Sequence, residues 1–200
     1  MPLPRRFYRR AAPVVARDLL GCLLVSRQGR SVAAGRIVET EAYLGPEDAA
    51  SHAAFRPGSR ALFYGDGGFA YVYLNYGMHS CLNAITNRRG KPGCVLIRAL
   101  EPGLRRRAMA RRRGVAPDSP RLTSGPGNVT RALGISARHN GADLTGSRLT
   151  VEPPGQPGEF SIGCGPRVGI RRARERRLRF WITGNRYVSK PAGDLHDQRP

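Results

Sequence analysis

The sequence predicts a single α+β domain, in which short strands and short helices are mixed along the chain. Its 200 residues fit the usual size of one domain and suffice to bury a substantial core. β-prone runs alternate with helical segments, and two of these runs flank a turn-like segment, as in a β-hairpin. No repeat or composition shift marks a boundary, so we expect one domain over residues 1–200, ending in a flexible tail at 190–200.

The N-terminal part of the chain is predicted as a helix, two strands and a second helix. Residues 13–20 are expected to be helical, because a proline suits the first turn and a glycine follows the last. The two strands are expected at residues 22–26 and 32–40. Residues 47–54 also look helical, and Glu47 and Asp48 would then be first-turn acids that face the positive end of the helix dipole.

A β-hairpin is predicted in the middle of the chain. Its arms are the runs 71–74 and 81–85, which flank the turn-like segment 75–78. Tyr76 and Met78 would lie at its tip, where large apolar side chains gain little from burial. Two interpretations stay open: the tip enters a base stack from the minor groove as a wedge, or it folds back on the core.

The second half of the chain adds further strands and helices. Strands are expected at residues 94–100 and 180–183, and a short helix is expected over 124–133. The turn that opens this helix could offer backbone N–H groups to a phosphate. Residues 104–114 carry six arginines around a methionine, which could form a basic helix face, although a solvated charge run is the commoner explanation.

The charge of the chain points to a polyanionic partner. Lys and Arg number 34 against 14 Asp and Glu, which gives a formal net charge of +20. Nucleic acid is the obvious partner, because guanidinium groups neutralise phosphates and release counterions. A composition bias toward Arg, Ala, Gly and Pro would supply the same charge without a purpose, and charge alone does not decide between these explanations.

The cysteines and the hydropathy pattern narrow the class of protein. Cys22, Cys81, Cys94 and Cys164 form no C-x-x-C pair, so they indicate buried, reduced thiols rather than a metal site or disulfide framework. We expect no metal and no cofactor. The chain shows neither a signal peptide nor an apolar stretch of about 20 residues. We therefore expect a soluble, intracellular protein without membrane contact.

Two carboxylates and an aromatic ring share one face of the extended segment 38–43. Side chains alternate along a strand, so Glu39, Glu41 and Tyr43 would point to the same side. In a partly buried cleft, desolvation and mutual repulsion would make one of the carboxylates a candidate general base. On an exposed face the same carboxylates would pair with arginines, and these residues alone favour that second interpretation.

The hairpin arms carry further candidates for a binding site. Tyr71 and Tyr73 lie on one side of the first arm, and Asn83 lies on the return arm. Aromatic strand residues are usually part of the core. Together with the asparagine and a nearby histidine they could instead form a slot that stacks a planar base and reads its edge.

Several longer motifs occur in order: RIVETEAYLGPED (36–48), YVYLNYGM (71–78), CVLIRALEP (94–102), LTSGP (122–126), GPRVG (165–169) and LRF (178–180). In these motifs the chain resembles the alkyladenine (3-methyladenine) DNA glycosylase family, over residues 6 to 189. The resemblance implies a mixed domain built on a curved antiparallel sheet with a protruding β-hairpin, not the helix-hairpin-helix glycosylase fold. The chain length suits a compact bacterial member.

The resemblance also implies catalytic and DNA-wedging residues. Glu41 matches the general base of the family, and Arg98 and the backbone carbonyl of Val168 match groups that hold the attacking water. Tyr76 matches the intercalating wedge, and Met78 lies beside it at the hairpin tip. Cleavage of a purine N-glycosidic bond passes through a sugar cation, which a nearby carboxylate stabilises while it activates water.

Five further residues match the pocket that receives the flipped base. Tyr43 and Tyr73 match the aromatic residues that sandwich the base, and His52 matches the residue at its edge. Asn83 matches the side chain that crowds the amino group of normal guanine, and Leu96 is expected to complete the pocket.

These observations predict a monofunctional DNA glycosylase for alkylated or deaminated purines in double-stranded DNA, which flips the base out and leaves an abasic site. An alkylated purine is already cationic and leaves unaided, whereas a neutral deaminated base would need protonation. The only lysines, Lys91 and Lys190, do not adjoin the motifs, which favours hydrolysis without a Schiff base. The alternatives are a non-catalytic nucleic-acid binder and a basic structural protein.

Overall fold

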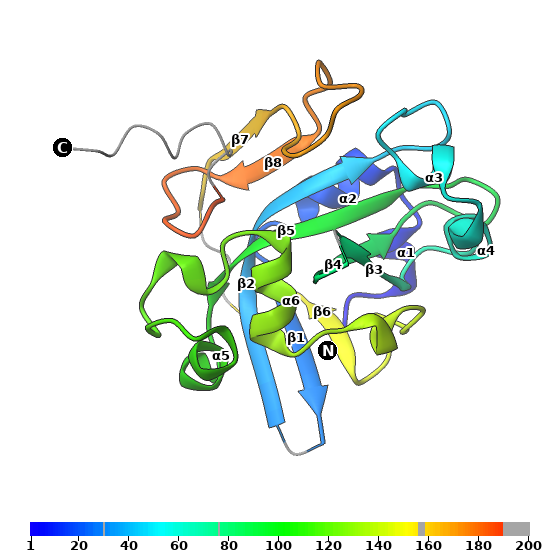
Figure 1. Cartoon of the computed structure of the whole chain (residues 1–200). Coiled ribbons are helices and arrows are strands. Elements are labelled where there is room, and N and C mark those ends of the chain that lie inside the picture. The colour runs from blue at the N-terminus through cyan, green and yellow to red at the C-terminus, as the bar shows by residue number, and fades with distance from the viewer. Residues whose placement is uncertain (30, 76, 156–158, 190–200) are drawn as a thin grey trace.

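The computed structural model describes residues 1–29, 31–75, 77–155 and 159–189, and it confirms the α+β class. The strands are β1 (Leu23–Gln28), β2 (Ser31–Tyr43), β3 (Ala70–Asn75), β4 (His79–Ile85), β5 (Cys94–Pro102), β6 (Leu149–Glu152), β7 (Ile162–Gly165) and β8 (Arg179–Ile182). They form one curved antiparallel sheet in the order β3-β4-β5-β2-β1-β6, with β8 paired to β2 and β7 paired to β8 (Figure 1).

Short helices surround this sheet. They are α1 (Arg5–Tyr8), α2 (Ala12–Asp18), α3 (His52–Phe55), α4 (Arg60–Phe63), α5 (Arg106–Arg113) and α6 (Pro126–Leu133), with 3-10 turns at Pro57–Ser59, Pro120–Leu122 and Ala137–His139. In Figure 1, α2 lies behind β2 and β5, and α6 lies in front of β5. Within the described ranges, no helix is long and apolar enough to cross a membrane.

β2 is the central strand and fixes the direction of the side chains that matter for the site. It pairs with β1, β5 and β8, so Glu39, Thr40 and Glu41 have no exposed surface. The hydroxyl of Thr40 donates a 2.9 Å hydrogen bond to the carbonyl of Ala16 in α2. Because side chains alternate along a strand, Glu39 and Glu41 point to the sheet face opposite α2.

The pairing of β2 with β5 is irregular near these carboxylates. The register shifts twice between Ile37 and Thr40, and the regular pairs leave out Val38 of β2 and Arg98 of β5. Such β-bulges bend a strand locally and re-aim side chains. Here the irregularity accompanies an arginine of β5 that reaches two carboxylates of β2.

The arginine-rich segment forms helix α5, and its arginines divide into two groups. Arg107 and Arg111 are exposed, as expected of a solvated charge run. Arg112 Nη1 instead donates to the carbonyl of Ala132 at 3.0 Å, and Arg113 Nε donates to the carbonyl of Leu122 at 3.2 Å. Two of the arginines therefore tie α5 to its neighbours.

The helix expected over residues 47–54 is wrong for most of its length. Residues 45–51 form turns and bends, and α3 begins only at His52. The side chain of Asp48 explains the difference, because its two oxygens accept hydrogen bonds from the backbone N–H groups of Leu44 and Ala50. Asp48 is fully buried, so it is not a first-turn acid on the surface.

The predicted hairpin is confirmed as β3 and β4, paired from Ala70 with Ala84 to Asn75 with His79. Met78 is 73% exposed at the tip, and Leu74 is 49% exposed on the first arm. At Met78 the tip therefore does not fold back on the core. Tyr76 lies outside the described residues.

Candidate active site

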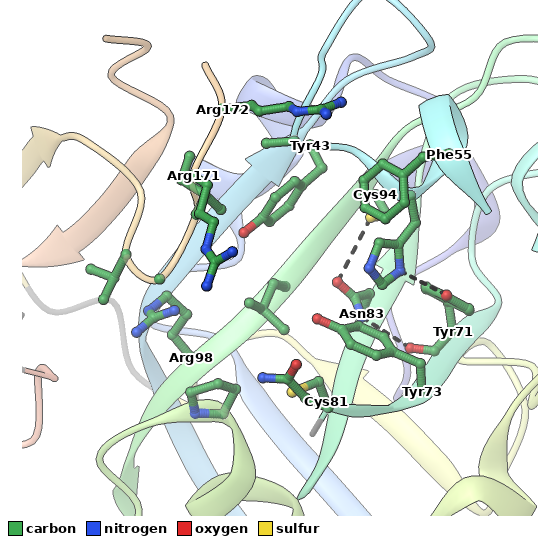
Figure 2. Close-up of a pocket in the computed structure, with 18 of the residues that line it drawn as sticks. Tyr43, Phe55, Tyr71, Tyr73, Cys81, Asn83, Cys94, Arg98, Arg171 and Arg172 are labelled. Carbon is green, nitrogen blue, oxygen red and sulfur yellow. Dashed lines mark hydrogen bonds between the residues drawn. The ribbon is translucent and has the colours of Figure 1, made fainter. Parts of the chain in front are cut away.

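A pocket of about 600 Å³ opens on the sheet face that carries Glu41. The pocket is lined by Tyr43 of β2, Leu96 of β5, Asn83 of β4 and Tyr73 of β3, which are neighbouring strands in that order. Figure 2 shows Asn83 between the two tyrosines. Because β4 and β5 separate β2 from β3, the two tyrosine-bearing backbones are three strand spacings apart, or roughly 14 Å. The volume falls in the range of about 300–1,000 Å³ that is usual for small-molecule sites.

Glu41 lies beneath this pocket and is held by donors from three segments of the chain. Its Oε1 accepts a 2.7 Å hydrogen bond from the backbone N–H of Val168, and its Oε2 accepts a 2.8 Å bond from the Tyr43 hydroxyl. Arg98 Nη1 lies 3.4 Å from the same Oε2. The carboxylate is therefore fixed in one orientation, as a general base requires.

Glu39 lies on the same face but is engaged differently. It accepts hydrogen bonds from Arg98 Nε at 3.0 Å and from Arg179 Nε at 2.7 Å. The carboxylates of Glu41 and Glu39 outweigh the opposing effect of burial and raise the pKa of Arg98, so its guanidinium stays charged. The two acids and two arginines form one buried network. The favoured interpretation of an exposed, arginine-paired face is therefore wrong about exposure but right about the partners.

Tyr43 is held from behind by a buried ion pair. The Arg167 guanidinium lies 4.6 Å from the centre of its ring, within cation–π range. Arg167 in turn donates to both oxygens of Asp48, at 2.6 and 2.8 Å. Burial and the neighbouring Glu41 raise the pKa of Tyr43 well above its usual value, so the hydroxyl remains a donor to Glu41.

His52 stands against the aromatic wall of β3. Its ring meets Tyr73 edge-on with centroids 4.4 Å apart, and its Nδ1 lies 2.8 Å from the hydroxyl of Tyr71. Burial, aided by the charge of Arg56, lowers the pKa of His52 to about 4. The imidazole is therefore neutral near pH 7. If Ser59 donates to the Tyr71 hydroxyl, as the 3.1 Å contact indicates, Tyr71 donates to Nδ1 and the ring proton resides on Nε2.

The floor of the pocket is locked by hydrogen bonds to Asn83. Its Nδ2 donates to the backbone carbonyl of Tyr71 at 3.2 Å, and its Oδ1 accepts from the Cys94 thiol at 3.7 Å. Burial raises the pKa of the Cys94 thiol, so the thiol stays protonated and can donate. Cys81 also lines the pocket. All four cysteines are free, and three are buried, while Cys164 is only half-buried.

Two exposed arginines border the pocket, and the sequence did not single them out. Arg171 and Arg172 follow Val168 and line the pocket (Figure 2). Neither makes an ion pair or side-chain hydrogen bond with any residue in the described part of the chain. Both guanidinium groups remain available to an anionic ligand at the pocket mouth.

Most residues singled out from the sequence come together in this structure. Those at the pocket or directly beneath it are Glu41, Tyr43, His52, Tyr73, Asn83, Leu96, Arg98 and Val168. Met78 lies apart from the pocket lining, at the hairpin tip. Sequence reasoning missed Asp48, which it placed on a helix surface, and Arg167, although GPRVG was noted as a motif. It also missed Phe55, which lines the pocket beside His52.

The arrangement has the features of an enzyme that acts on a planar base of a nucleic acid. Aromatic rings offer stacking surfaces, a buried carboxylate lies beneath the pocket and contacts three residues that line it, and arginines at the mouth can meet phosphates. Among the residues that the structure describes, no group of three or more His, Cys, Asp or Glu side chains could hold a metal ion.

Comparison with known proteins identifies the family to which the chain is similar. The sequence profile of the methylpurine-DNA glycosylase family matches residues 6–186. A protein of Methanoculleus marisnigri is 45% identical over 193 residues, which cover 95% of this chain and all of the relative. One from an Anaeromyxobacter species is 45% identical over 97% of this chain and 95% of the relative, and one from Legionella pneumophila is 40% identical over 94% and 98%. All three are provisionally named 3-methyladenine DNA glycosylase.

The chain therefore belongs to the methylpurine-DNA glycosylase family. It is a DNA N-glycosylase, a hydrolase that acts in base excision repair of alkylated purines.

Proposed function

We propose that the protein excises alkylated purines, 3-methyladenine among them, from double-stranded DNA by flipping the damaged nucleotide into the pocket. Glu41 activates a water that attacks the sugar, and the products are a free base and an abasic site. The observation that carries this proposal is the position of Glu41, a fully buried carboxylate directly beneath an aromatic pocket of about 600 Å³. As a repair enzyme for DNA, it would act in the cytoplasm, as a monomer on the nucleoid.

Stacking supports a flipped purine as the substrate. Tyr43 presents one ring face to the pocket, because the Arg167 guanidinium covers the other. His52 and Tyr73 stand on the opposite wall, and a planar base between these walls would be held from both sides. The rigidly bonded Asn83 would crowd the extra amino group of normal guanine and so disfavour undamaged DNA.

The chemistry requires one carboxylate and no covalent intermediate. The bond from the purine to C1′ breaks as positive charge develops on the sugar, and a nearby anion stabilises that charge. Glu41 accepts the proton of the water, while Arg98 and the Val168 carbonyl hold the water in place. A methylated purine leaves without an acid because it is already cationic. A neutral deaminated purine such as hypoxanthine would need a proton, so we expect its excision to be slower.

Hydrolysis without strand cleavage is the expected outcome. A lyase step would need an amine to form a Schiff base with the sugar. Within the described ranges no lysine lines the pocket, and Lys91 lies in the turn between β4 and β5. The protein should therefore be monofunctional.

The test is single-turnover excision by Glu41→Gln on a duplex that carries one 7-methylguanine. The substitution keeps the shape of the side chain but removes its charge and its ability to accept a proton. A positioned base contributes about 10²- to 10⁴-fold, so the rate should fall by that factor while affinity for the lesion duplex is kept or slightly raised. Glu101→Gln, a partly exposed acid of β5, is the matched control and should excise normally. A near-normal rate for Glu41→Gln would overturn the mechanism.

A further inference from the structure

We propose that Glu39 is a positioning residue that anchors Arg98 and keeps its guanidinium from closing onto Glu41. The inference rests on the proposed function, in which Glu41 is the general base. It explains why a second fully buried carboxylate stands two residues before the base on the same strand face.

The contacts of Glu39 leave it no capacity to act on a substrate. Its Oε1 accepts hydrogen bonds from Arg98 Nε, Arg179 Nε and the Ser189 hydroxyl, at 3.0, 2.7 and 2.8 Å. Its Oε2 accepts from the backbone N–H of Ser189 at 2.7 Å. Glu39 and Glu41 are both fully buried, but they differ in how their donors relate to the pocket. The three donors to Glu41 line the pocket, whereas Arg98 is the one donor to Glu39 that does. Glu39 therefore acts through the groups that it binds.

Arg98 is held more firmly by Glu39 than by Glu41. Its Nε makes a 3.0 Å hydrogen bond to Glu39, and its Nη2 donates to the Ser189 hydroxyl at 3.2 Å. Its Nη1 approaches Glu41 only to 3.4 Å, which is longer than the ~2.7–2.9 Å of a good charge-assisted hydrogen bond. The anchored side of the guanidinium thus limits how closely the free side approaches the base.

Charge balance predicts what happens when the anchor is weakened. Glu39 and Glu41 together match Arg98 and Arg179, so this buried network is electrically neutral. Without the charge of Glu39, two guanidinium groups share one carboxylate, and Arg98 is drawn to Glu41. A tight ion pair between Arg98 and Glu41 occupies the oxygen lone pair of Glu41 that must accept the proton of water. The same ion pair favours the deprotonated Glu41 carboxylate at lower pH.

The other groups near Glu41 remain when Glu39 is replaced. They are the Tyr43 hydroxyl on β2, the Cys81 thiol on β4, the Val168 N–H and the Arg167 guanidinium in the segment after β7. A change in the pH profile of a Glu39 variant therefore reports on Arg98 together with the loss of the Glu39 charge, and Ser189→Ala, which changes no charge, reports on the position of Arg98 by itself.

The experiment measures Glu39→Gln in single-turnover excision of 7-methylguanine from about pH 5 to 9. We expect the plateau rate to fall by about 10- to 100-fold, because a small displacement of a positioned group has effects of this order. The acid limb, which is the fall of the rate on the acidic side of the pH profile, should have its midpoint at lower pH. Affinity for the lesion duplex should not change. Glu152→Gln is the matched control, because Glu152 pairs with Arg27 at 2.7 Å at the far edge of the sheet. Its rate and profile should equal those of the unaltered protein.

Ser189→Ala keeps the inference testable if Glu39→Gln does not fold. It removes one donor to Glu39 and the acceptor of Arg98 Nη2 without changing any charge. A smaller rate loss with an acid-limb shift in the same direction supports the proposal. Thr183→Ala, which removes an exposed hydroxyl just after β8, is the control.

The outcomes also separate this inference from the proposed function. A normal rate and a normal acid limb in Glu39→Gln, or in Ser189→Ala where only that variant folds, overturn the anchoring role alone. Loss of the acid limb in Glu39→Gln, combined with its retention in Glu41→Gln, would identify Glu39 as the base. That result would overturn both proposals.

Discussion

Buried charged partners hold the side chains of this site in position. Tyr43 is backed by Arg167, which is paired with Asp48, and the side chains of that ion pair have no exposed surface. Breaking a buried pair by removing one partner costs about 3–5 kcal/mol, because the other charge is left uncompensated. Replacing Asp48 or Arg167 would therefore lower the free energy of unfolding and also shift the ring of Tyr43.

His52 gives a prediction about stability and pH. Its pKa is about 4 in the folded protein and 6.5 in an unfolded chain, so the unfolded state binds more protons between these values. Stability from this group is present above about pH 6.5 and is lost as the pH falls toward 4. Replacing His52 by Asn should reduce the loss of Tm between pH 7.5 and 5. The site is partly exposed, so we expect a difference of roughly 2–4 °C.

Thermal unfolding at both pH values measures this effect. His79→Asn, which removes an exposed histidine from β4, serves as the control and should lose as much Tm on acidification as the unaltered protein. Equal acid sensitivity of His52→Asn and the unaltered protein would mean that His52 is protonated as readily in the folded state as in the unfolded one.

The sequence predicted which side chains share a face at the site, but it did not predict the ion-pair partners of those side chains. The alternation of Glu39, Glu41 and Tyr43 on one face was recoverable from the strand period alone. Asp48 was assigned to a helix surface because its partner, Arg167, lies 119 residues away and leaves no local trace. The different contacts of Glu39 and Glu41 likewise depend on Arg179 and Ser189, which come near only when β8 pairs with β2. The catalytic and binding roles carried over from the family remain predictions.

At the scale of elements, strong local patterns were reliable, whereas two of the short strands were not predicted. The hairpin, β2 and β5 were predicted because they are long or bounded by clear turns. β6 and β7 were not predicted, although β8, which also has four residues, was expected at residues 180–183. β8 carries the apolar run Phe-Trp-Ile, whereas β7 has the sequence Ile-Gly-Cys-Gly, with two glycines. Pairing with a neighbouring strand, rather than propensity, makes such a segment a strand.

The hairpin gives a prediction at this scale. Tyr76 should be the wedge that holds the base stack open, and Met78, 73% exposed at the tip, should assist it. Unstacking a base step costs a few kcal/mol, so Tyr76→Ser should fold normally but flip the lesion poorly, and Met78→Ser should have a smaller effect. The fluorescence of an ethenoadenine in the duplex reports flipping directly.

Leu74→Ser separates a wedge from a general weakening of the hairpin. Leu74 is also apolar and half-exposed, but it lies on the arm rather than at the tip. It should flip ethenoadenine normally. If Tyr76→Ser shows unchanged fluorescence and excision, the tyrosine is not the wedge.

For the whole molecule, the positive charge belongs to the surface. Glu39, Glu41 and Asp48 are the fully buried acids of the described chain, and they are matched by three buried arginines, Arg98, Arg167 and Arg179. The interior is thus close to neutral, so the excess positive charge of the described residues is presented to solvent and to DNA. The formal net charge of +20 follows from composition, whereas the division of charge between interior and surface depends on the fold.

Binding to DNA should accordingly weaken steeply with salt. Each phosphate that is neutralised adds about 0.9 to the slope of log affinity against log salt. Changing Arg171 and Arg172 at the pocket mouth to Gln should reduce that slope by up to about 1.8, if each meets one phosphate. Changing Arg107 and Arg111, exposed on α5, to Gln removes the same charge away from the pocket and should reduce it less. Anisotropy titrations of a lesion duplex measure both slopes. An affinity that is flat with salt would exclude phosphate contacts as the main source of binding, and equal slopes for the two double variants would mean that net charge, rather than the pocket mouth, governs it.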